Sequence, residues 1–522
     1  MTTLKLAKSL QHYWKSFEQH PKISWGLSSL GLFLICSLAF LWNLGQTGLV
    51  DETEPLFAEA ARQMVRTGDW ITPYFNGETR FDKPPLVYWL MAVGYQIFGV
   101  NEWAVRFPSA LSAITLTVAC FFSLRYFGFF PSNLTTNSRQ KTRQLWLSAW
   151  IGSAVAAFHP ETIVWARQGV SDMLLSGCMG TALFCFFWGY VQAEKTTDQK
   201  IEKFSLSQVF LDFSFPNKGY LLFYILLGLA VLAKGPVGIV LPGLILLSFL
   251  LYVGNFRKAL QESKPTIGGI IFTIIAVPWY ILVTLRNGQD YINSFFGYHN
   301  FERFTNVVNG HAAPWYFYFL VVLIGFMPWS IYLPLAFWRS QFWKRSFWSQ
   351  QPRSHQLGLF AFFWFTCIFI FFSVSVTKLP SYVLPLMPAA SILIALLASE
   401  FIFQSNSAIA NTNTIKNKAI LMTGGLNIFF LIVLGIACIY SPQFIGSDPA
   451  ILNLPEQLEN SGLHLQGGII WIITAVLIAW ILQYPAQRRW LIGVNFAGFI
   501  AFLVLFVNPA IFFLDEVRQR PL

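Results

Sequence analysis

Residues 25–44, WGLSSLGLFLICSLAFLWNL, contain no charged side chain. A helix needs about 20 mostly apolar residues to cross the hydrocarbon core of a bilayer, so this stretch predicts a transmembrane helix. Similar apolar runs follow near residues 107–124, 145–158, 171–193, 219–233, 236–253, 267–285, 314–338, 357–376, 382–402, 418–440, 468–483 and 490–513. We therefore predict an all-α polytopic membrane protein with about 13 transmembrane helices.

The composition of the 522 residues excludes several classes of protein. Hydrophobic residues make up 55% of the chain and charged residues 11%, against about 25% charged residues in a soluble domain, which excludes a soluble enzyme and a disordered protein. A membrane β-barrel would instead show alternating segments of about 10 residues. The net charge of +11 does not indicate nucleic-acid binding, because the basic residues lie between the predicted spans. The six cysteines lie in apolar stretches without CxxC spacing, which indicates core thiols.

The distribution of charge predicts how the chain crosses the membrane. If the N-terminus is cytoplasmic, most Lys and Arg residues fall in cytoplasmic segments and most acidic residues fall in outer segments, as the positive-inside rule requires. Residues 1–24 show no cleavable signal pattern, so the first span is expected to be a retained anchor. The outer loops 45–106, 286–313 and 441–467 are too small to fold as soluble domains. We expect one integral membrane domain over residues 1–522.

The first outer loop predicts two helices that lie along the membrane surface. Pro55 suits the first turn of a helix and Gly68 suits its end. The apolar and polar side chains between them segregate to two sides, which is typical of an amphipathic interfacial helix. The apolar side is expected to consist of Leu56, Phe57, Ala60, Met64 and Val65. Residues 84–98 are apolar but too short to span, so they predict a second interfacial or re-entrant helix.

The same loop contains the first candidates for chemistry. Asp51 and Glu52 follow the first span at the outer surface, where a carboxylate can act as general base toward a hydroxyl. The alternative is that they are solvated loop acids or favour a helix N-terminus. Lys83 lies beside the membrane and could hold a lipid phosphate, or could simply extend its ammonium group to the interface.

Four stretches resemble one family in order along the chain. Residues 51–90, DETEPLFAEAARQMVRTGDWITPYFNGETRFDKPPLVYWL, are similar to the first outer loop of the ArnT-like, protein O-mannosyltransferase-related glycosyltransferases. ARQGVSDMLL (166–175), HNFERF (299–304) and KLPSYVLPLMPA (378–389) are similar to three later motifs of the family. The resemblance implies the GT-C membrane fold. It also implies an inverting transfer of a sugar from a polyprenyl phosphate, undecaprenyl phosphate in bacteria, to a lipid or protein at the outer face of the plasma (inner) membrane.

The resemblance also implies roles for individual residues. Asp51 matches the proposed catalytic base, Glu52 stands beside it, and Asp172 matches a second acid that orients or assists. Four residues match groups around the carrier phosphate, namely Lys83, Arg303, Lys378 and Tyr382. Asp82 and His299 match two ligands of a divalent metal, zinc or magnesium. No other cofactor is implied.

Two features set this chain apart from the aminoarabinose transferases. Glu54 stands where they usually have Arg, and the chain stops soon after the last predicted span instead of continuing into a sizeable outer domain. Both differences indicate a bacterial enzyme with a different acceptor. The rival class is a transporter or flippase of lipid-linked sugars, which usually has repeated halves and charges near the membrane midplane; neither is visible in this sequence.

Overall fold

The computed structural model describes residues 20–49, 53–130, 138–196, 206–302, 305–306, 312–404, 414–446 and 453–519. The first half of these residues forms α2 Pro21–Cys36, η1 Ser37–Leu41, α3 Thr53–Thr67, β1 Tyr74–Phe75, β2 Glu78–Thr79, α4 Leu86–Phe98, α5 Glu102–Phe127, α6 Ser138–Ala157, α7 Pro160–Ala166, α8 Ser171–Thr196, α9 Leu206–Leu211, α10 Lys218–Lys234, α11 Val237–Val253, α12 Phe256–Ser263 and α13 Pro265–Tyr291. The second half forms η3 Ile292–Glu302, α15 Phe317–Gly325, η4 Trp329–Tyr332, α16 Leu333–Ser340, α17 Arg345–Ser349, η5 Arg353–His355, α18 Leu357–Val374, η6 Pro380–Leu386, α19 Met387–Gln404, α20 Thr414–Ile439, α21 Ser441–Phe444, α22 Leu454–Ser461, α23 Leu463–Gln483, η8 Pro485–Trp490, α24 Leu491–Phe502, η9 Leu503–Val507 and α25 Asn508–Gln519.

The long helices confirm an all-α polytopic membrane protein. Nine helical segments of the described residues are long and apolar enough to span a membrane, and a pair bent by 112° (Phe317–Gly325 with Trp329–Ser340) would make ten. The other expected spans coincide with α6, α10 and α11, which are not among these nine. The first turns of α6 carry three cations, and α10 and α11 have 17 residues each. The predicted number of about 13 spans is therefore not confirmed.

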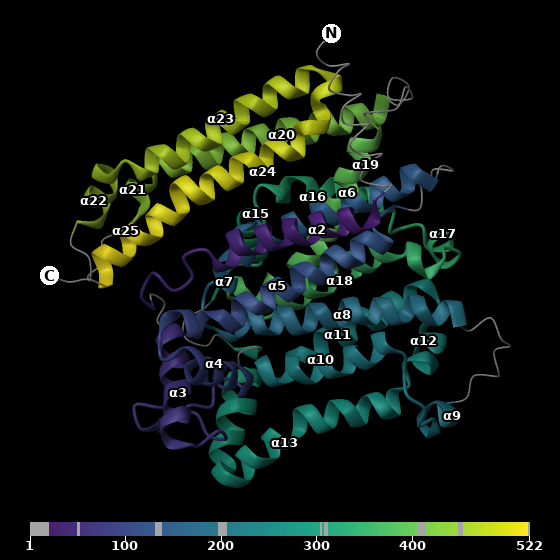
Figure 1. Cartoon of the computed structure of the whole chain (residues 1–522), viewed down its shortest axis with the longest axis vertical. Helices are drawn as coiled ribbons and strands as arrows, with labels where there is room; N and C mark the ends of the chain where they lie inside the picture. The colour runs from purple at the N-terminus through teal and green to yellow at the C-terminus, as the bar shows by residue number, and fades with distance from the viewer. Residues whose placement is uncertain are drawn as a thin grey trace.

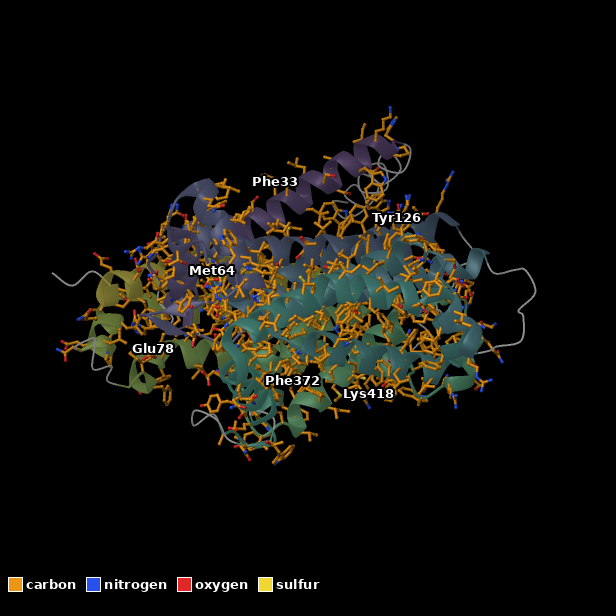
Figure 2. All side chains as sticks on the ribbon, turned by 90° about the horizontal axis from the view of Figure 1, so that it is seen from below. Phe33, Met64, Glu78, Tyr126, Phe372 and Lys418 are labelled. Carbon is orange, nitrogen blue, oxygen red and sulfur yellow. The ribbon has the colours of Figure 1, made fainter. Side chains whose placement is uncertain are left out.

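The helices and loops that do not span the bundle gather at its two ends. Figure 1 shows α3 and α4 at one end of the long helices and α9, α12 and α17 at the other. In Figure 2, Met64 and Glu78 lie at the α3 end, whereas Tyr126 lies toward the opposite end. Phe33 of α2 points away from the bundle and is 65% exposed. A large apolar side chain exposed in this way suits contact with lipid.

The two helices predicted in the first outer loop are present as α3 and α4; their position at the membrane surface stays a prediction. Gly68, with a φ of +73°, follows the last residue of α3, as expected for a glycine at a helix end. Phe57, Ala60 and Met64 are buried against the rest of the protein, but Leu56 and Val65 are only half-buried. Glu54, on the same helix, is instead almost completely buried. The apolar side of α3 is thus rotated slightly from the predicted one so that it includes a buried acid.

Arg106 of α5 accounts for the burial of Glu54. Its Nε and Nη2 atoms donate to the two carboxylate oxygens of Glu54 over 2.9 and 3.0 Å. The remaining donors reach the backbone carbonyls of Leu44, Thr47 and Gly48 over 2.6–3.0 Å. All five guanidinium N–H groups are therefore used, and they hold the segment after the first span against α5.

A variant of Arg106 tests this clamp. Arg106→Met should destabilise the protein by about 3–5 kcal/mol, because it leaves Glu54 as a buried acid without its cation. The measurement is the thermal unfolding temperature of purified protein in detergent. Arg62→Met is the control, since Arg62 is 46% exposed in its pair with Glu59 and such pairs contribute about 0–1 kcal/mol. Equal losses in the two variants would contradict a clamping role for Arg106.

Candidate functional site

A short hairpin positions the Asp82-Lys83 motif at the α3 end of the bundle. β1 and β2 pair antiparallel across Asn76-Gly77, whose φ angles are +51° and +84°. Asn-Gly favours this two-residue turn, because both residues tolerate positive φ. The chain leaves β2 directly into Arg80 and Asp82, which therefore sit between the hairpin and α4.

Asp82 is the centre of a group of polar contacts. Arg80 Nη2 donates to its Oδ2 over 2.7 Å, and the Tyr88 hydroxyl donates to its Oδ1 over 2.9 Å. Lys83 Nζ lies 3.9 Å from Oδ2 and donates to the backbone carbonyl of Asp82. Burial raises the pKa of the Asp82 carboxyl, but Lys83, Arg80, Tyr88 and His299 together outweigh burial and hold this pKa below its usual range. Asp82 is therefore ionised at neutral pH.

Asp172, at the start of α8, forms a second group with residues from two other helices. Lys234 Nζ, from the end of α10, lies 2.5 Å from Asp172 Oδ1. The Ser381 side chain, from η6, also hydrogen-bonds the carboxylate. The same Lys234 ammonium lies 5.3 Å from the centre of the Tyr382 ring, within the range of a cation–π contact. Asp172 is thus held by its partners rather than left free.

The two groups belong to one site. Lys83 interacts electrostatically with Asp172 as well as with Asp82, and His299 of η3 interacts in the same way with Asp82. The structure therefore brings together five of the residues predicted from the sequence: Lys83, Asp82, His299, Asp172 and Tyr382. With their partners Arg80 and Lys234 they come from five separate parts of the chain. We call these seven residues the outer cluster, after the predicted outer loop that contains Asp82 and Lys83.

Lys378 lies in the loop before η6 and has a different environment. Its side chain is buried, and the ammonium group donates to the backbone carbonyl of Ser375. The neighbouring Thr377 hydroxyl donates to the carbonyl of Asn306 over 2.7 Å, which ties this loop to the segment after η3. Lys378 therefore binds the backbone of its own loop in this structure.

Three predicted site residues, Asp51, Glu52 and Arg303, lie outside the described residues. The chain before Asp51 is held by the Arg106 clamp and by Asp515 of α25, which accepts a 2.8 Å hydrogen bond from the Gly48 N–H. After the acidic pair, Glu54 accepts a 2.7 Å hydrogen bond from the Gly169 N–H, three residues before Asp172. Both flanks of the Asp51-Glu52 segment are therefore fixed, one of them to the segment that carries Asp172.

The residues expected to hold a metal do not form a complete metal site by themselves. Within the described ranges no group of three or more His, Cys, Asp or Glu side chains is close enough to hold a metal ion. A catalytic zinc ion usually has about three protein ligands, whereas Asp82 and His299 supply two. Both carboxylate oxygens of Asp82 also already accept hydrogen bonds. A requirement for zinc or magnesium stays a prediction.

A second buried acid, Glu161 of α7, lies near Asp172. Its Oε1 accepts a 2.9 Å hydrogen bond from Trp165 Nε1, and its side chain packs against Gly325 at the bend after α15. Burial raises the pKa of Glu161 to about 8; the Trp165 hydrogen bond opposes this shift and the charge of Asp172 adds to it. Glu161 is therefore mostly protonated at neutral pH and adds little negative charge beside the outer cluster.

Sequence reasoning missed several partners of the predicted residues. Arg80 and Tyr88 lie two residues before and six residues after Asp82, and Ser381 stands inside the motif that begins at Lys378, so a closer reading of these motifs could have found them. Nothing in the sequence near Glu54 indicated Arg106 as its partner, because Arg106 lies 52 residues away in the chain.

Comparison with known proteins gives matches over most of the chain. The sequence model of the family described as dolichyl-phosphate-mannose-protein mannosyltransferase matches residues 82–131. An uncharacterised protein of Aquifex aeolicus is 31% identical over 379 residues, which cover 70% of this chain and 72% of that protein. The undecaprenyl phosphate-alpha-4-amino-4-deoxy-L-arabinose arabinosyl transferase 2 of Sodalis glossinidius is 27% identical over 449 residues, covering 85% of this chain and 70% of that enzyme.

A solved structure shares the fold. ArnT from Cupriavidus metallidurans, crystallised with undecaprenyl phosphate, matches with a TM-score of 0.67 over 95% of this chain and 78% of its own, at 21% sequence identity. The apo form of the same protein matches with a TM-score of 0.65. The chain therefore has the GT-C fold.

The pKa of Glu161 gives a pH-dependent prediction. In the unfolded chain Glu161 loses its proton near its usual value of 4.5, whereas in the folded protein it keeps the proton up to about pH 8. Stability should therefore fall by up to about 1.4 kcal/mol per pH unit between these values. Glu161→Gln removes this loss, so its unfolding temperature should rise relative to the wild type between pH 5 and pH 8.

The control for this prediction is Glu59→Gln. Hydrogen bonding to Arg62 lowers the pKa of Glu59. The contribution of Glu59 to stability is therefore complete above the usual pKa of a glutamate and stays constant from pH 5 to pH 8. A difference between Glu161→Gln and the wild type that does not change over this range would show that Glu161 is ionised in the folded protein.

Proposed function

The chain belongs to the ArnT-like, protein mannosyltransferase-related family of membrane glycosyltransferases, and we propose that it moves a sugar from a polyprenyl-phosphate carrier to a hydroxyl of a lipid or protein. The observation that carries this proposal is the outer cluster, which combines cations and carboxylates at one end of a bundle of membrane-spanning helices. The names of the relatives support undecaprenyl phosphate as the carrier and a pentose or hexose as the sugar.

The balance of charge in the outer cluster suits a phosphate leaving group. Arg80, Lys83 and Lys234 face two carboxylates, those of Asp82 and Asp172, so the cluster keeps one positive charge. When the bond between the sugar and the phosphate breaks, negative charge grows on the phosphate, and fixed cations stabilise it. Lys83 is the residue we assign to this role, with Tyr382, which lies beside Lys234, donating a hydrogen bond. Arg303 and Lys378 are further candidates.

The acids have separate roles in this proposal. Asp51 takes the proton of the attacking hydroxyl as general base, with Glu52 next to it. Asp172 is bound to Lys234 and Ser381, which makes it a poor base and a good positioning residue for Lys234. Attack from the face opposite the phosphate inverts the anomeric carbon in a single displacement.

The experiment that tests the function uses purified protein in lipid nanodiscs. Undecaprenyl-phosphate aminoarabinose and undecaprenyl-phosphate mannose are supplied with a bacterial lipid extract, and release of undecaprenyl phosphate is measured by mass spectrometry. We expect release to depend on the extract, and Lys83→Gln to lower the rate by about 10²-fold or more, since a fixed cation at developing charge contributes at that level. Lys258→Gln, an exposed cation on α12, is the control. The same protein in sealed proteoliposomes tests the alternative: movement of the intact donor from one leaflet to the other without sugar transfer would favour a flippase instead.

The assignment of the base has its own test. Asp51→Asn keeps the size of the side chain but cannot accept a proton at neutral pH, so turnover should fall by about 10²–10⁴-fold. Glu52→Gln removes the same charge one position away and should cost less. The same assay measures both, and unfolding temperatures should stay close to that of the wild type. If Glu52→Gln is the more damaging change, Glu52 rather than Asp51 is the base.

We also propose that the outer cluster faces the extracytoplasmic side of the inner membrane and that the N-terminus is cytoplasmic. The positive-inside bias of the loops supports this orientation. Alkaline phosphatase fused within the loop before α3 should be active, because it folds only outside the cytoplasm. The same fusion in the loop between α11 and α12 should be inactive. The reverse pattern would place the outer cluster in the cytoplasm.

A further inference from the structure

The end of the bundle opposite the outer cluster contains an arginine surrounded by aromatic rings. The guanidinium carbon of Arg125, near the end of α5, lies 4.1 Å from the centre of the Trp146 ring and 5.8 Å from the rings of Trp25 and Tyr126. Trp25 comes from α2 and Trp146 from α6, and their ring centres are 5.1 Å apart. Three helices therefore build this aromatic cage, and Figure 2 shows Tyr126 on the side of the molecule away from Met64 and Glu78.

Arg125 has no acidic partner in the described part of the chain. No ion pair involves it, and its Nε atom is buried without a hydrogen-bond partner. A half-buried cation that lacks a counter-ion is costly. The guanidinium group presents its N–H donors in a planar fork, and this geometry matches two oxygens of a phosphate.

The surroundings of the cage are also strongly basic. α2 and α6 contain no Asp or Glu, and the one acid of α5, Glu102, stands at its other end. The nearby turns of α2 and α6 also contain Lys22 and Lys141. Three described acids at this end of the bundle have cationic partners: Asp212 with Lys264, Glu262 with Arg353 and Glu400 with Arg339. A fourth, Glu194, accepts hydrogen bonds from the backbone N–H of Arg353.

We propose that the Arg125 cage binds the phosphate of an anionic phospholipid in the leaflet opposite the outer cluster. The chemistry of recognition is a guanidinium–phosphate pair, with Trp25 and Trp146 placed at the depth where aromatic side chains meet lipid headgroups. Basic residues of the neighbouring turns strengthen the local attraction for negative charge. Because the cage joins α2 to α5 and α6, a bound lipid holds the first span in place.

Native mass spectrometry of the detergent-solubilised full-length protein tests this proposal. We expect the wild type to retain phosphatidylglycerol in preference to phosphatidylcholine. Arg125→Gln should bind phosphatidylglycerol about tenfold more weakly, since it loses a charge-assisted pair. Lys258→Gln removes the same charge at the same end of the bundle and should bind like the wild type. Arg125→Lys keeps the charge but not the two-pronged geometry, so it should fall between the wild type and Arg125→Gln, and it decides the question if Arg125→Gln does not fold.

Three outcomes would overturn the proposal. One is that folded Arg125 variants bind phosphatidylglycerol as tightly as the wild type does. Another is that phosphatidylcholine binds equally well, which would mean that the negative charge of the lipid is not recognised. The third is that inorganic phosphate at millimolar concentration displaces the lipid, because the site would then take a free anion rather than a lipid headgroup.

Discussion

The buried ion pair between Arg106 and Glu54 is the contact on which the geometry of the outer cluster depends. The five N–H donors of the Arg106 guanidinium group bind the Glu54 carboxylate and three backbone carbonyls of the segment that follows the first span. In a region with little water, an unsatisfied carbonyl or charge costs several kcal/mol, so this segment cannot shift without losing several of these contacts together. Glu54 also binds the Gly169 N–H, which connects the first motif to the one that carries Asp172. Arg106 and Glu54 thus fasten the start of α3 both to the segment after the first span and to the segment that carries Asp172.

The outer cluster shows how membrane helices can hold several charges close together. Each buried carboxylate has a cation within hydrogen-bonding distance, Arg80 for Asp82 and Lys234 for Asp172. Burying such pairs costs desolvation, and charged side chains near membrane segments therefore mark functional positions more often than structural ones. Here the pairs leave Lys83 shared between two carboxylates. A ligand phosphate that competes for Lys83 would meet a cation whose position is already set by its neighbours, which keeps the reorganisation cost low.

Local patterns in the sequence predicted the helices. Features that depend on contacts between residues far apart in the chain could not be predicted in this way. Long apolar runs predicted the helical membrane class, and Pro55 and Gly68 predicted α3, because helix ends depend on nearby residues. The number of spans did not follow from the same runs, since the basic start of α6 and the short α10 and α11 leave their length in the bilayer undecided. Glu54 was noted only as a departure from a motif. Its burial depends on Arg106, and no local rule identifies a partner 52 residues away. The resemblance places Lys378 near the carrier phosphate; its ammonium group donates to the carbonyl of Ser375 in the same loop, and its role toward the phosphate stays a prediction.

The two ends of the bundle differ in which of their cations are paired with acids. These pairings indicate which cations could bind an outside anion, and a count of Lys and Arg residues does not. The positive-inside rule counts all Lys and Arg residues and does not distinguish those paired with acids from those that are not. At the outer cluster the cations lie next to carboxylates, so most of their positive charge is neutralised within the protein. At the other end Arg339 and Arg353 are likewise paired with acids, whereas Arg125 contacts aromatic rings and, among the described residues, no acid. This contrast is the basis for proposing that Arg125 pairs with an anion from outside the chain. The lipid phosphates of the adjacent leaflet are the anions always present at that depth.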